Sequence, residues 1–135
     1  MPVLVDTGVL YAVADRDDAW HKRALAFLEN TSELLLVPVT VIPEVTYLLR
    51  ARLGERAERA FVVSLAAGEL GIEPLTGTDL TRCAAIMGSH PDVGFVDASL
   101  VAIAERLKVT TIATTDRRHF GQIRPKHCAA FALVP

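Results

Sequence analysis

Short apolar runs alternate with longer segments of helical periodicity along this chain. The apolar runs are rich in aliphatic and β-branched residues and predict buried strands over residues 3–5, 34–38, 70–74, 109–114 and 129–134. Between these runs, apolar residues recur three and four positions apart, which predicts helices over residues 9–14, 19–29, 43–53, 55–67, 78–88 and 93–108. The last helix is the clearest, because Val96, Leu100, Ile103 and Leu107 share one face.

Strands that alternate with helices are typical of parallel sheets joined by right-handed crossovers. We therefore expect an α/β fold, a three-layer α/β/α sandwich with a mainly parallel central sheet. The 135 residues contain no repeat, linker or low-complexity segment, so residues 1–135 are expected to form a single domain. With 51% hydrophobic and 22% charged residues, the composition is that of a globular chain.

The composition also argues against several classes of protein. Cys83 and Cys128 lie far apart without metal-ligand spacing, which is typical of reduced thiols in a cytosolic protein. The amino terminus has no signal-peptide pattern, and no apolar run approaches the length of a membrane span, so we expect a cytoplasmic protein without membrane contact. A net charge of −2, from 16 acidic and 14 basic residues, neither indicates nor excludes a nucleic-acid partner.

Four acidic residues occupy unusual positions for surface carboxylates. Asp6 and Asp116 each follow a predicted buried strand, and the carboxyl ends of parallel strands form the rim where α/β sheets bind ligands. Glu44 lies in the first turn of a helix that follows a strand, so it starts near the same rim. Asp97 lies in the first half of another helix, and only tertiary packing can bring it to the other three.

Each of these acids also has a simpler interpretation. Asp6 can cap the next helix, and Asp116 can cap the turn at residues 117–119 or pair with its arginines. The carboxylates of Glu44 and Asp97 can simply interact with the positive ends of their helix dipoles, and each such interaction stabilises the fold by about 0.3–1 kcal/mol. Carboxylates held close together repel and raise one another's pKa, whereas a divalent cation reverses that cost. The four together favour a metal site, with Asp6 and Asp97 as ligands and Glu44 and Asp116 as further candidates.

An all-oxygen ligand set suits Mg²⁺ or Mn²⁺. Such an ion lowers the pKa of a bound water and stabilises charge on a phosphodiester, and a carboxylate left unbound can act as general base. Thr7 and Thr115 adjoin the strand-end aspartates, where each hydroxyl can fix a carboxylate or a water, or the residue can simply be a strand former or a cap.

Basic residues near the acids are candidates for binding phosphate groups. Arg117 and Arg118 directly follow Asp116, and we expect them to contact the substrate. His119 adds a group that can gain charge near neutral pH. The remaining arginines after Glu44 are expected to be solvated or paired with Glu55 and Glu58, namely Arg50, Arg52, Arg56 and Arg59. Packing is the expected role of Trp20 and Phe120.

The order and spacing of these segments resemble the PIN-domain family, and within it the VapC-type toxins of prokaryotic toxin–antitoxin pairs. The segments that carry the resemblance are Val5–Leu10, the isolated Glu44, Gly94–Leu100 and Thr114–Phe120. It covers essentially the whole chain and implies a PIN-like α/β/α sandwich and a Mg²⁺- or Mn²⁺-dependent ribonuclease that cuts RNA. It also implies a catalytic quartet of Asp6, Glu44, Asp97 and Asp116, a cognate antitoxin protein and a homodimer.

Two positions near the quartet need comment. Gly8 departs from the Ser or Asn that is frequent there in the family, which removes one hydroxyl or amide from the pocket. Asp92 is a weaker acid candidate, and we expect it to cap the helix that begins near Val93.

Two other functions stay open at this stage. An aspartyl-nucleophile phosphatase would place an aspartate after the first strand, as here, but it would need a second acid at the position of Gly8. A non-catalytic binding module would act through protein or RNA contacts alone, and the presence of all four acids argues against it.

Overall fold

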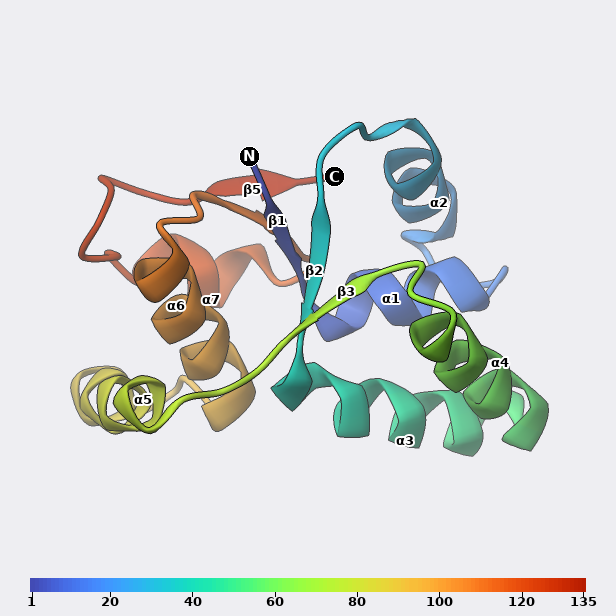
Figure 1. The fold of residues 1–135 in the computed structure, drawn as a ribbon, viewed down its shortest axis with the longest axis horizontal. Coiled ribbons are helices and arrows are strands. Elements are labelled where there is room, and N and C mark those ends of the chain that lie inside the picture. The colour runs from blue at the N-terminus through green and yellow to red at the C-terminus, as the bar shows by residue number, and fades with distance from the viewer.

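A single parallel sheet of five short strands forms the centre of the molecule (Figure 1). The computed structural model describes all 135 residues. The strand order is β3-β2-β1-β4-β5, and every neighbouring pair is parallel. The strands are β1 (Val3–Val5), β2 (Leu35–Pro38), β3 (Gly71–Glu73), β4 (Thr111–Ala113) and β5 (Ala132–Val134).

Helices cover both faces of this sheet. Figure 1 shows α1 to α4 on one side and α5 to α7 on the other, which confirms the three-layer α/β/α sandwich. The first group comprises α1 (Thr7–Ala14), α2 (His21–Asn30), α3 (Ile42–Leu53) and α4 (Glu55–Ala66). The second group comprises α5 (Gly77–Ser89), α6 (Phe95–Leu107) and α7 (Arg117–Gln122). None of them is long and apolar enough to cross a membrane.

The structure differs from the sequence expectations at helix starts and at strand ends, where the last two strands begin at Thr111 and Ala132 and not at residues 109 and 129. Helix α1 begins directly after Asp6, whose carboxylate accepts the backbone N–H of Thr7. A short 3₁₀ turn, η1 (Val39–Val41), precedes α3. Helix α7 was expected only as a turn. The expectation that Asp92 caps α6 is wrong, because Gly94 is the N-cap residue and no side chain caps this end.

The sheet centre and helix α6 form the deepest part of the core. All three residues of β1 are buried, and α6 is buried continuously from Ala98 to Glu105. Charged pairs then fasten α5 to α6. Asp79 accepts two hydrogen bonds of 3.1 Å from Arg106 and completes a capping box with Thr76. These contacts hold the last turn of α6 against the first turn of α5.

The strand order reverses between β1 and β4. From β1 the chain moves to β2 and β3 on one side, then returns to β4 and β5 on the other. At such a switch point the connections leave the strand ends in opposite directions, so a crevice opens between them. Asp6 follows β1 and Asp116 follows β4, and the fold therefore places both beside this crevice.

Candidate functional site

An open pocket of about 390 Å³ lies at the crevice between the ends of β1 and β4. All four acids that the sequence singled out line this pocket, whereas Arg117 and Arg118 do not. The lining residues are Asp6, Thr7, Gly8, Glu44, Gly94, Phe95, Val96, Asp97, Thr115 and Asp116. Eight of the ten are polar, charged or glycine, so the pocket suits a charged ligand.

Asp6 lies at the floor of the pocket and is held rigidly. Only 5% of its surface is exposed. Its Oδ1 accepts the backbone N–H of Thr7 at 2.8 Å, and its Oδ2 accepts the hydroxyl of Thr114 at 2.8 Å. The Thr114 hydroxyl in turn accepts the backbone N–H of Asp116 at 2.9 Å. One buried hydroxyl therefore sets the relative positions of both strand-end aspartates.

The sequence points to the hydroxyls of Thr7 and Thr115 as candidates for this supporting role, with capping or strand formation as the alternatives, whereas the hydroxyl that bonds Asp6 in the structure is that of Thr114. The two-residue period of a strand could not distinguish the two threonines, because Ile112 and Ala113, one on each side, are both fully buried. Thr115 packs over Gly8, where its hydroxyl fills the space that a side chain at position 8 would need. The Gly8 departure from the family pattern thus has a steric explanation in this chain.

Thr7 keeps its expected place beside Asp6, but its hydroxyl has no hydrogen-bond partner. The residue is 6% exposed and lines the pocket, and its Oγ1 is buried. Buried hydroxyls are almost always paired, so an unpaired one beside a polar pocket indicates a ligand group or water there.

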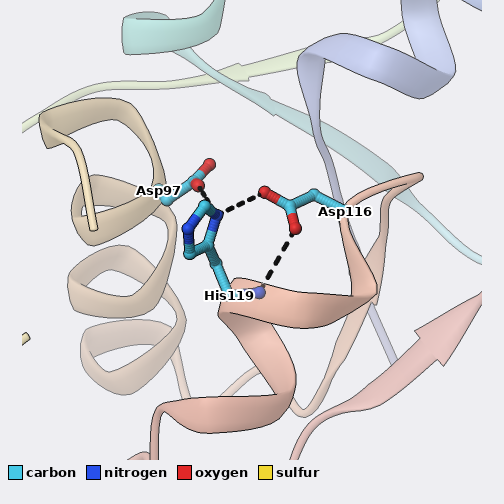
Figure 2. Close-up of side chains that lie close together, drawn as sticks. All are labelled: Asp97, Asp116 and His119. Carbon is cyan, nitrogen blue, oxygen red and sulfur yellow. Dashed lines mark hydrogen bonds and ion pairs between the residues drawn. The ribbon is translucent and has the colours of Figure 1, made fainter. Parts of the chain in front are cut away.

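Asp97, Asp116 and His119 form a compact cluster at one side of the pocket (Figure 2). His119 Nδ1 lies 2.7 Å from Asp116 Oδ2 and 3.4 Å from Asp97 Oδ2. The backbone N–H of His119 also donates to Asp116 Oδ1 at 3.2 Å. Asp92 approaches the opposite ring nitrogen, Nε2, at 3.7 Å. Sequence analysis had noted only that His119 can gain charge, and no local pattern pointed to this contact with α6.

Burial and crowding change the protonation of these acids. Burial is the largest cause that raises the pKa of Asp97 to about 7, and the charges of Asp6 and Asp116 add to it. Burial also raises the pKa of Asp6. For Asp116 burial acts in the same direction, but hydrogen bonds from His119 outweigh it and leave the pKa of that carboxyl below its usual value. The same pairing raises the pKa of His119.

Glu44 stands at the exposed rim of the pocket, in the first turn of α3. Its charge contributes to the raised pKa of Asp6 and of Asp97, so it lies within electrostatic reach of both. A hydrogen bond of 2.6 Å between the hydroxyls of Thr40 and Ser99 ties η1 to α6. This bond joins the two segments that carry Glu44 and Asp97, and sequence reasoning had not anticipated it.

The two arginines expected to bind substrate differ in their surroundings. Arg117 donates to the backbone carbonyl of Pro135 at 2.5 Å, and its guanidinium lies 5.6 Å from the ring centroid of Trp20. Arg118 is exposed and takes part in none of the ion pairs. Phe95, which sequence analysis did not consider, is 41% exposed and lines the pocket.

The donor set fits a divalent cation. One ligand atom from each of Asp97, Asp116 and His119 lies within 4.8 Å of the others. Asp6 and Glu44, which are not part of this cluster, add carboxylates to the adjoining pocket, and Thr7 lines it with a buried hydroxyl that has no hydrogen-bond partner. Oxygen and imidazole donors around a water-accessible cavity can hold an ion and leave room for a phosphate oxygen.

We expect Asp97→Asn to stabilise the metal-free protein at alkaline pH. Asp97 ionises near pH 3.8 when unfolded but near pH 7 when folded, so stability falls as the pH rises through this window. The variant escapes this loss, and after discounting for solvent screening we expect a gain of about 1–3 kcal/mol at pH 8 that shrinks towards pH 4. Thermal unfolding in EDTA measures it, with the exposed-loop variant Asp17→Asn as control. A lower melting temperature for Asp97→Asn at pH 8 would show that this carboxylate stabilises the fold.

Gly8→Ser should destabilise the protein through a collision with Thr115. A Cβ at position 8 would overlap the Thr115 hydroxyl and stand 3.3 Å from its Cβ. We expect a loss of about 1–3 kcal/mol, largely recovered in the double variant Gly8→Ser/Thr115→Ala. Gly88→Ser is the matched control, because position 88 has open space around it. Additive effects at positions 8 and 115 in denaturant unfolding would contradict this steric coupling.

Comparison with known proteins agrees with this geometry. A family model described as PIN domain matches residues 3–124. Ribonuclease VapC26 of Mycobacterium tuberculosis is 30% identical over 135 residues, which span 98% of this chain and 100% of that protein.

Solved structures show the same fold. Mycobacterium tuberculosis VapC20, described as a sarcin–ricin loop cleaving toxin, superposes with a TM-score of 0.77 at 22% identity and covers 82% of this chain and 86% of its own. VapBC2 from Rickettsia felis, bound to a DNA fragment from its promoter, superposes with a TM-score of 0.71 at 11% identity, and the match covers 100% of both chains. The sequence match, the parallel sheet and the acidic pocket at its switch point together show that this chain belongs to the PIN-domain family.

Proposed function

We propose that the protein is a Mg²⁺- or Mn²⁺-dependent endoribonuclease and the toxin component of a type II toxin–antitoxin system. The observation that carries this proposal is the pocket lined by Asp6, Glu44, Asp97 and Asp116. Membership in the PIN-domain family and 30% identity to a protein named as a ribonuclease support it. We propose that the protein acts in the cytoplasm, which agrees with an RNA substrate.

The acids divide the work of holding the ion. Asp6, fixed through both oxygens by Thr7 and Thr114, is the rigid ligand at the pocket floor. Asp97 lines the same pocket from α6 and is the second ligand, while Asp116 and Glu44 are further candidate ligands that add negative charge around the opening. When bound, a divalent cation lowers the pKa of a water and stabilises the charge that develops on the phosphodiester.

The remaining groups position the substrate. Glu44 is exposed at the rim, so its carboxylate is free to take a proton from an attacking water. Thr7 offers a buried, unpaired hydroxyl that can orient that water or a phosphate oxygen. Arg118, exposed one residue beyond Arg117 in the first turn of α7, neutralises a neighbouring phosphate, and Arg117 supports the turn through Pro135.

We propose two protein partners, an antitoxin and a second copy of this chain, by analogy with similar proteins. The similar solved structures include a toxin–antitoxin complex from Klebsiella pneumoniae with a TM-score of 0.72 over 98% of this chain. By analogy, this protein binds a cognate antitoxin that restrains its activity, and it forms a homodimer. Light scattering of the purified chain, alone and with the antitoxin, measures both states.

Cleavage of RNA should require a divalent metal ion and the pocket acids. We expect the parent protein to cut RNA with Mg²⁺ or Mn²⁺ but not with EDTA, and Asp6→Asn or Asp97→Asn to lower the rate about 100-fold or more. Asp17→Asn, an acid in the exposed loop between α1 and α2, should leave the rate unchanged. Cleavage in EDTA, or cleavage that survives both pocket substitutions, would refute the proposed chemistry. A folded, metal-binding protein that cuts no RNA would support a binding module.

Arg118→Ala should weaken substrate binding more than turnover. Removing one phosphate contact is expected to raise KM about 3- to 10-fold, leave kcat nearly unchanged, and reduce the salt dependence of binding by about one counterion. Arg56→Ala removes an exposed arginine from α4, away from the pocket, and serves as control. A fall in kcat at constant KM would instead give Arg118 a role in the transition state.

A further inference from the structure

We propose that His119 is itself a metal ligand, through Nδ1, beside Asp97 and Asp116. This assignment rests on the proposed metal-dependent function and makes the pocket a mixed nitrogen–oxygen site. Because Mg²⁺ prefers oxygen ligands and imidazole suits transition metals, such a site favours Mn²⁺ over Mg²⁺.

The spacing of the three donor atoms supports ligation. Two ligands at right angles about an ion, each at about 2.1 Å, stand roughly 3 Å apart. His119 Nδ1 lies 2.7 Å from Asp116 Oδ2 and 3.4 Å from Asp97 Oδ2, and the three donors share one 4.8 Å cluster. Figure 2 shows the ring between the two carboxylates, with Nδ1 turned towards both. The two distances from Nδ1 thus lie on either side of the roughly 3 Å expected for neighbouring ligands, and the two carboxylate oxygens lie within 4.8 Å of each other.

The far side of the ring supplies a second observation. Metal-bound histidines usually donate their other ring N–H to a carboxylate or carbonyl, which fixes the ring and raises its basicity. Here Asp92 Oδ2 lies 3.7 Å from His119 Nε2, so a carboxylate already stands on that side. His119 adjoins the acidic pocket through Asp97 and Asp116, which line it. Thr7, which lines the same pocket, has a buried hydroxyl without a hydrogen-bond partner.

A purely structural role for His119 makes the opposite prediction. Capping of α7 uses only the backbone N–H of His119, so the cap does not require the ring. If the ring were only an ion-pair partner of Asp116, it would compete with a metal ion for that carboxylate, and removing it would tighten metal binding. If Nδ1 is a ligand, the proton it now shares with Asp116 passes to solvent when the ion binds, and removing the ring weakens binding.

Metal titration and spin-echo spectroscopy separate these two roles. We expect the full-length parent protein to bind Mn²⁺ with a directly coordinated ¹⁴N signal in electron spin-echo envelope modulation. His119→Ala and the bulkier His119→Gln should lose this signal and bind Mn²⁺ at least about 10-fold more weakly, with a smaller loss for Mg²⁺. His90→Gln, at the end of α5 and outside the cluster of Asp97, Asp116 and His119, is the matched control.

Two results would overturn the assignment: a parent Mn²⁺ complex without ¹⁴N coupling, or unchanged or tighter Mn²⁺ binding by both folded His119 variants. The second result combined with metal-dependent RNA cleavage would leave the proposed ribonuclease standing and remove only the histidine ligand. Conversely, ¹⁴N coupling that disappears in the His119 variants, together with no RNA cleavage by the parent, would establish the ligand and remove the ribonuclease.

Discussion

The hydroxyl of Thr114 joins the two strands on which the whole pocket is built. It donates to Asp6 and accepts from the backbone of Asp116, so a single oxygen sets the distance between the acids that end β1 and β4. Asp6 is also held by the first N–H of α1, which leaves its carboxylate little freedom to rotate. The other two acids then take their places according to how α3 and α6 pack against this fixed edge.

Burial of carboxylates, with their mutual repulsion added to it, disfavours negative charge in the metal-free pocket. The structure reduces it in two ways: Asp97 retains a proton close to neutral pH, and the His119 ring lies against Asp116. Both arrangements are reversible, because each depends on a proton and not on a fixed countercharge such as an arginine. The metal-free site therefore carries less negative charge than four ionised carboxylates would give it, and its carboxylates can still lose these protons to bind an ion.

Local sequence was sufficient for the parts of the site that lie at strand ends. Asp6 and Asp116 follow short, strongly apolar runs, so their place at the rim could be predicted. Asp97 belongs to a helix whose position depends on packing across the sheet, which no local pattern encodes. The choice between Thr114 and Thr115 depends on which side of β4 each faces, and α7 has only six residues, too few to show helical periodicity. That the acids act in catalysis stays a prediction.

Gly8 and Thr115 share a volume that holds only one side chain. A change that moves a hydroxyl from position 115 to position 8 therefore needs two substitutions, and their order matters. If Thr115 shrinks first, the intermediate has an empty space beside Asp6; if Gly8 grows first, the intermediate has overlapping atoms in the same place. The two routes between alternative versions of this pocket are therefore unequal, because one passes through a cavity and the other through a steric overlap.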